Sequence, residues 1–154
     1  MPSTYNGCGI QFLYPENWNL SEEEDAAEDT QTIMLESPEG VFFSIHRLRR
    51  MGGPGEAIER ALEAMRGEYP EIEVEESGAL SVAAGATGVL DPLTESGADL
   101  SFYYLDLLIT VRMLAISTGG DVLLMQMQGE SRDFDKQERV LAAIIHSIRN
   151  SLPS

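Results

Sequence analysis

The sequence is poor in positive charge. Its 154 residues include ten lysines and arginines against 26 aspartates and glutamates, so the formal net charge is −16, and Lys136 is the only lysine. Such a chain repels the phosphate backbone of nucleic acids. The most basic segment, residues 46–50, is short and is soon followed by acidic residues. We therefore expect no nucleic acid among the partners.

Cysteine and long apolar runs are also scarce. Cys8 is the only cysteine, so the chain cannot form an internal disulfide, and the polar start of the sequence lacks a secretory signal. Both features fit a reducing compartment, and we expect a cytoplasmic location. No apolar run reaches the roughly 18 residues of a membrane-spanning helix, so we expect no membrane insertion.

The common catalytic and metal-binding motifs are absent from the sequence. His46 and His146 belong to no His-x-x-x-His or Cys-x-x-Cys spacing, and there is no Gly-x-Ser-x-Gly. Cys8 could act as a nucleophile only beside a histidine. The glycines at 52, 53 and 55 lack the lysine of a phosphate-binding loop. We predict no catalytic residue, metal or cofactor, which favours a non-catalytic role but leaves an enzymatic one open.

Hydrophobic periodicity predicts two amphipathic helices, over residues 55–66 and 135–149. Asp135 suits the N-cap of the second helix, and Glu138 lies where a capping box has its second partner. The apolar stripes are Ile58, Ala61, Leu62 and Met65 in the first helix, and Leu141, Ile144, Ile145 and Ile148 in the second. Each stripe predicts a helix packed on a sheet.

Apolar and alternating segments predict an antiparallel sheet. We expect residues 9–14 to form a hairpin with a strand that returns from Trp18. Residues 100–117 contain no glycine, proline or asparagine, so we expect one long strand, bulged near Asp106. This strand and residues 122–128, joined at Gly119-Gly120, are apolar on both faces, which implies cover on both faces. Further strands are predicted over 32–36, 41–48, 72–76, 79–82 and 87–90.

Residues 9–18, Gly-Ile-Gln-Phe-Leu-Tyr-Pro-Glu-Asn-Trp, resemble the aromatic-Pro-x-x-Trp opening of the Mog1/PsbP-like superfamily, in its bacterial DcrB-like or an uncharacterised branch. Residues 121–128, and the helix that closes on 146–149, are similar to the family's ending. The resemblance implies one domain over residues 1–154. It also implies an α+β fold, a three-layer α/β/α sandwich around an antiparallel, strongly bent sheet of about six to eight strands. It implies little about activity, since members include Ran-GTPase-binding proteins and photosystem II subunits.

Six of the nine residues from 21 to 29 are acidic, which predicts a solvated, mobile loop. The loop lacks the spacing of a calcium site. We interpret the chain as a non-catalytic binding or adaptor domain, whose acidic surface binds a protein partner with a basic surface. The predicted contact residues are Glu22, Glu23, Glu24, Asp25, Glu28 and Asp29.

A second hypothesis is a small-ligand-binding protein or weak hydrolase with a polar pocket near residues 91–112. We expect Arg112 to pair with one of the acids between residues 91 and 106. A third possibility is self-association through the edge of the long strand, so we expect a monomer or a weak dimer. The predicted pocket residues are Asp91, Glu95, Tyr104, Asp106 and Arg112.

Overall fold

The computed structural model describes residues 2–7, 9–25, 30–49, 52–69, 72–75 and 95–152. The predicted strands 79–82 and 87–90, and the candidate residues Glu28, Asp29 and Asp91, lie outside these ranges. The elements are β1 (Pro2–Gly7), β2 (Ile10–Pro15), β3 (Asn19–Asp25), β4 (Thr30–Glu36), β5 (Phe42–Leu48), α1 (Pro54–Glu68), β6 (Glu73–Glu75), β7 (Glu95–Tyr104), β8 (Leu107–Thr118), β9 (Asp121–Glu130) and α3 (Ser131–Ser151).

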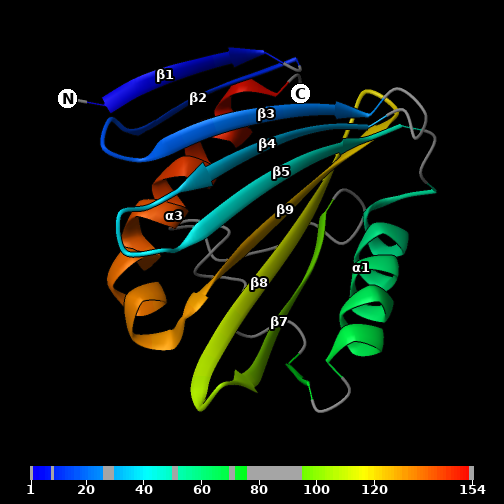
Figure 1. Cartoon of the computed structure of the whole chain (residues 1–154). Coiled ribbons are helices and arrows are strands. Elements are labelled where there is room, and N and C mark those ends of the chain that lie inside the picture. The colour runs from blue at the N-terminus through cyan, green and yellow to red at the C-terminus, as the bar shows by residue number, and fades with distance from the viewer. Residues whose placement is uncertain are drawn as a thin grey trace.

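The strands form an open seven-stranded antiparallel sheet, in the order β3-β4-β5-β9-β8-β7-β6, and a separate two-stranded sheet of β1 and β2. Helix α3 lies with the β1–β2 hairpin on one side of the large sheet, and α1 lies on the other (Figure 1). The predicted α+β fold with three layers is therefore confirmed, and α1 and α3 are its two predicted main helices.

Cover on both faces of the central strands is also confirmed. On β8, Leu114 and Ile116 belong to the core under α3 and the β1–β2 hairpin, while Met113 and Ala115 belong to the core under α1. Because side chains alternate along a strand, a strand buried on both faces is expected to be apolar on both. Residues 111–116 are all buried, and all of them except Arg112 are apolar.

The predicted hairpin of residues 9–14 with a strand from Trp18 is wrong. β2 pairs with β1, and the rings of Tyr5 and Phe12 lie 5.1 Å apart on the face toward the core. The Trp18 N–H donates to the Pro15 carbonyl at 3.1 Å, and the chain then enters the large sheet as β3. The aromatic pair stabilises the hairpin with the preceding segment, which is otherwise polar.

The single long strand predicted over residues 100–117 is also wrong. It is two strands, β7 and β8, joined by Leu105 and Asp106 with φ of 49° and 66°. Gly119 and Gly120 join β8 to β9 with positive φ in the same way. Two-residue hairpin loops favour such left-handed pairs because their twist matches that of the strands. The prediction failed because leucine is a poor residue for this conformation.

Two further predictions need correction. The prediction of an acidic loop is wrong for residues 21–25, which belong to β3 and pair with β4. Tertiary pairing here overrides the weak strand propensity of glutamate.

Helix α3 begins at Ser131, not Asp135, and its N-cap residue, Glu130, makes no side-chain cap bond. Glu138 accordingly forms no capping box, and it accepts a hydrogen bond from Arg112 instead.

Candidate functional site

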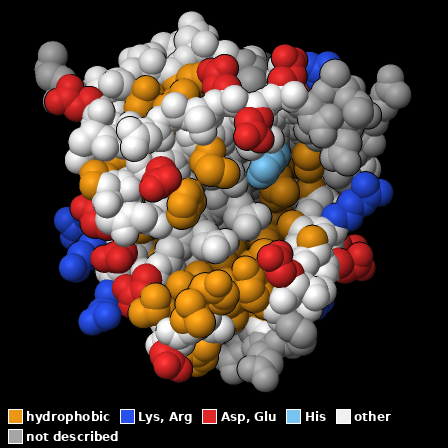
Figure 2. All heavy atoms as spheres, in the orientation of Figure 1, with side chains coloured by type: hydrophobic (Ala, Val, Ile, Leu, Met, Phe, Trp, Pro, Cys, Tyr) orange, Lys and Arg blue, Asp and Glu red, His pale blue; other side chains and the backbone are white. Residues whose placement is uncertain are grey.

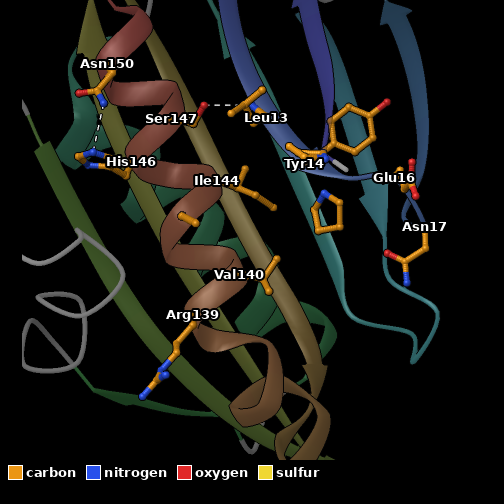
Figure 3. Close-up of a pocket in the computed structure, with 13 residues that line it drawn as sticks. Leu13, Tyr14, Glu16, Asn17, Arg139, Val140, Ile144, His146, Ser147 and Asn150 are labelled. Carbon is orange, nitrogen blue, oxygen red and sulfur yellow. Dashed lines mark hydrogen bonds between the residues drawn. The ribbon is translucent and has the colours of Figure 1, made fainter.

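A groove of about 970 Å³ lies between α3 and the β1–β2 hairpin. Figure 3 shows Val140 and Ile144 pointing from the helix toward Tyr14, while Arg139 points away from the hairpin. The volume is in the range of small-molecule sites, which are usually apolar with a few polar groups. The groove is lined by Pro2, Leu13, Tyr14, Pro15, Glu16, Asn17, Arg139, Val140, Ala143, Ile144, His146, Ser147 and Asn150.

Two serines of α3 hold the hairpin in place. The Leu13 N–H donates to Ser147 Oγ at 2.9 Å, and the Gln11 N–H donates to Ser151 Oγ at 3.1 Å. Residues four apart on a helix are spaced by about 6 Å along its axis, and alternate residues of a strand by about 6.7 Å. The two spacings match, so both serine hydroxyls can accept hydrogen bonds from the N–H groups of β2 that point away from β1.

The groove has an apolar wall and a polar rim. Leu13 is 49% exposed on one side, and the exposed Ala143 faces the groove from α3. On the rim, the His146 ring and the Asn150 amide are 3.1 Å apart, between Nε2 and Nδ2. This arrangement suits binding of an apolar group. Sequence reasoning missed the groove because its lining comes from residues 2–17 and 139–150, and no local pattern brings these ranges together.

Four of the acidic candidates, Glu22, Glu23, Glu24 and Asp25, lie on β3, an edge strand of the large sheet. Glu22, Glu23 and Glu24 are all exposed, and the Gln31 amide donates to Glu24 Oε1 at 3.2 Å. Asp25 is the last residue of the strand. Alternation places Glu22 and Glu24 on one face of the sheet and Glu23 on the other. The three carboxylates are thus held at a fixed spacing along an open edge.

The pocket predicted near residues 91–112 is not assembled by the described residues. Glu95 begins β7 and accepts a hydrogen bond from Arg149 at 2.7 Å, whereas Tyr104 ends the same strand and Asp106 lies in the turn beyond it. Glu95 and Tyr104 are the two ends of the ten-residue strand β7, so they lie roughly 30 Å apart. These residues therefore cannot contact one small ligand together.

Arg112 does pair with an acid of the predicted segment, as expected. Its Nε donates to Asp99 Oδ1 at 2.9 Å, and its Nη1 donates to Glu138 Oε1 at 3.0 Å. The guanidinium carbon lies 5.2 Å from the centre of the Phe134 ring, within the range of a cation–π contact. The arrangement joins α3 to the sheet.

Among the described residues, no group of three or more histidine, cysteine, aspartate or glutamate side chains is placed to hold a metal ion. Within the same ranges, no helix combines the length and the apolar character needed to cross a membrane.

The fold can be compared with solved structures. The Ran-binding protein Mog1p of Saccharomyces cerevisiae superposes with a TM-score of 0.62 at 7% identity, over 99% of this chain and 95% of that one. Cyanobacterial PsbP (CyanoP) of Synechocystis superposes with a TM-score of 0.54 at 9% identity, over 95% and 90%. This chain has the Mog1/PsbP-like fold.

The Mog1/PsbP-like resemblance predicted from residues 9–18 and from the end of the chain is thus confirmed for the fold. No family model matches the sequence, and no curated protein matches it either. At 7% and 9% identity the likeness concerns the fold alone, so the function must be argued from this chain's own surface.

Proposed function

We propose that this chain is a non-catalytic binding domain that recognises a protein partner through the acidic edge formed by Glu22, Glu23 and Glu24. The partner carries a complementary basic surface. The observation that supports this most is the exposure of three consecutive glutamates on an edge strand of a chain with net charge −16. Mog1p, which shares the fold, is itself a Ran-binding protein, so a binding role is compatible with this architecture.

The local charge at this edge is uncompensated. Within the described ranges, no salt bridge joins any of the three glutamates to a cation, while Arg47, Arg112 and Arg149 are held in ion pairs with Asp121, Asp99 and Glu95. Unpaired carboxylates along an exposed strand create a locally negative potential at this edge of the sheet. Such a potential raises the association rate of a basic partner.

Salt dependence tests this role. We would capture partners from native lysate at low salt, identify them by mass spectrometry, and measure the affinity of the purified partner across ionic strengths. Exposed charges are screened beyond about 8 Å at physiological ionic strength, so the affinity should fall steeply with salt. The variant Glu22→Gln/Glu23→Gln/Glu24→Gln should bind more weakly and with a smaller salt slope.

A matched control removes the same charge elsewhere. Glu59 and Glu63 on α1 and Asp135 on α3 are exposed, so Glu59→Gln/Glu63→Gln/Asp135→Asn also neutralises three acids. The control should bind as the wild type does, apart from a small uniform effect of net charge. Equal losses in both triple variants would show that net charge matters and that the β3 edge has no special role.

The groove favours a second candidate function, the binding of a small apolar molecule. The observation that favours it is the volume of the groove, about 970 Å³, together with the apolar lining that Leu13 and Ala143 contribute. Ala143→Trp would fill the groove from an exposed helix position and should leave the fold intact. A compound that raises the melting temperature of the wild type, but not that of Ala143→Trp, would support this function. A compound that stabilises both proteins equally would place its site elsewhere.

A further inference from the structure

The end of the β7–β8 hairpin is apolar and exposed. We call residues 103–108 the hairpin tip. Five of its six side chains are large and apolar, and the sixth is Asp106. The exposed fractions are 75% for Tyr103, 54% for Tyr104, 80% for Leu105, 45% for Leu107 and 36% for Leu108. Figure 2 shows hydrophobic side chains gathered at the lower end of the molecule, where β8 begins in Figure 1. Contiguous patches of this kind mark interaction sites.

Helix cover stops just before the hairpin tip. Tyr69, at the end of α1, stacks on Phe102 with ring centres 4.1 Å apart. On the other face, Ser131 at the start of α3 shares a 2.6 Å hydrogen bond with Thr110. Beyond these contacts the two strands continue for two residue pairs and the turn, roughly 10 Å. The tip therefore extends beyond the part of the sheet that the two helices contact.

The hairpin tip is apolar on both faces. Tyr103 pairs with Leu108, and Tyr104 pairs with Leu107, so adjacent pairs point to opposite faces of the sheet, with Leu105 at the apex. Further along β8, apolar side chains on both faces pack against α3 on one side and α1 on the other. At the tip, the exposed fractions show that neither helix covers these side chains.

The turn itself holds a residue that its conformation disfavours. Leu105 has φ of 49°, a left-handed conformation in which glycine or asparagine is strongly preferred. The β8–β9 turn uses Gly119 and Gly120 for the same geometry. Leu105 is also the most exposed of the five apolar side chains. Leucine at this position therefore neither favours the turn conformation nor packs in the core. We infer that its side chain contacts another molecule.

We propose that the hairpin tip inserts into an apolar pocket of a partner protein whose rim is basic. Asp106 lies within the tip, and residues 95–111 contain three acids and no lysine or arginine. The net charge of −16 opposes a second copy of this chain and an anionic membrane alike. The basic rim rests on the proposed function, whereas the apolar anchor does not. Aromatic and leucine anchors in desolvated pockets carry most of the energy of such interfaces.

Photo-crosslinking from the hairpin tip tests the insertion. The full chain with p-benzoylphenylalanine at position 103 is irradiated in native lysate, and products are identified by mass spectrometry. The partner is then purified and its affinity measured. Leu105→Asn keeps the left-handed turn but removes the apolar side chain, and should weaken binding about tenfold or more. Tyr103→Ser/Leu108→Ser, which leaves the turn unchanged, should do the same.

Met34→Asn is the matched control, since Met34 is a 37% exposed apolar residue on β4. It should bind as the wild type does. The proposal is overturned if position 103 cross-links to no other protein, if it cross-links only to a second copy, or if Leu105→Asn binds with unchanged affinity. Tip-dependent binding to phosphatidylcholine or phosphatidylglycerol vesicles would overturn it in favour of lipid. If Glu22→Gln/Glu23→Gln/Glu24→Gln binds normally while Leu105→Asn does not, the acidic edge fails and the apolar anchor stands.

Discussion

Asp99 and Arg112 face each other directly across β7 and β8, and the Arg112 Nε donates to Asp99 Oδ1 at 2.9 Å. Both side chains are largely buried, and Glu138 from α3 accepts a second bond from the guanidinium. Burial alone lowers the pKa of Arg112, but hydrogen bonds and charge from Asp99 and Glu138 outweigh it and raise the pKa above the usual value. Arg112 is therefore a permanent cation at the junction of sheet and helix.

Replacing Arg112 should be costly because it leaves the Asp99 carboxylate buried without its partner. We expect Arg112→Met to lower the free energy of unfolding by about 3 kcal/mol, measured by urea denaturation. The double variant Asp99→Ala/Arg112→Met should recover at least about 1 kcal/mol of this loss. Equal destabilisation of the single and double variants would mean that packing against Phe134, and not the ion pair, sets the cost.

His46 gives the stability a pH dependence. It is partly buried on β5, with Nδ1 3.0 Å from Thr32 Oγ1, and desolvation by burial lowers its pKa from the usual 6.5. Between the folded and unfolded pKa values, the unfolded chain binds a proton that the folded chain does not. The stabilisation by neutral His46 is thus complete above about pH 7.5 and declines as the pH falls through 6.5 and below the folded pKa.

The variant His46→Gln should remove this part of the pH dependence while it keeps a polar group for Thr32. Between about pH 7.5 and 5, the melting temperature of the wild type should fall relative to that of the variant. His146→Gln, at an exposed position of α3, is the control for loss of one imidazole. A constant difference across the whole range would exclude His46 as the titrating group.

Leu105→Asn should stabilise the protein. Asparagine tolerates the left-handed conformation that leucine occupies at φ of 49°, so the variant should gain about 1 kcal/mol in unfolding free energy. Leu108→Asn removes a comparable side chain from a regular strand position and should give no gain. If Leu105→Asn is instead destabilised, the exposed leucine contributes to the fold, and its presence in the turn is structural.

Ser147→Ala should loosen the β1–β2 hairpin without unfolding the sheet. The change removes the acceptor of the Leu13 N–H and should cost about 1 kcal/mol. Hydrogen exchange should show faster exchange of the Leu13 amide, while amides of β8 and β9 keep their protection. Asn150→Ala, on the same side of α3, is the control. Unchanged exchange at Leu13 would mean that packing alone holds the hairpin.

Sequence reasoning succeeded where a local pattern decides the structure. The apolar stripes of residues 55–66 and 135–149 predicted α1 and α3, and apolar positions on both faces of residues 107–116 and 122–128 predicted a doubly covered sheet. The pairing of Arg112 with an acid near it in sequence was also predictable, since an arginine opposite an apolar row needs a nearby partner.

The failures occur where distant contacts override local preference. Glu22, Glu23 and Glu24 favour a solvated loop, yet pairing with β4 makes them strand. Leu105 carries no turn signal, so only the sheet register reveals the turn. The groove depends on packing of β2 against α3. Among the described residues of the predicted pocket, Glu95 and Asp106 lie near opposite ends of the β7–β8 hairpin, which no local pattern in the sequence indicates.

The two serine contacts between α3 and β2 join segments that are synthesised far apart in time. Ser147 follows Leu13 by 134 residues, and a ribosome adds roughly 5–20 residues per second, so the helix emerges roughly 7–27 s after the hairpin. During that interval the side of β2 that carries Ile10 and Phe12 has no helix to cover it. Apolar surface that is exposed in this way during synthesis favours aggregation until the helix packs on it. The β1–β2 hairpin is synthesised first, but its contacts with α3 can form only after the last helix has been made.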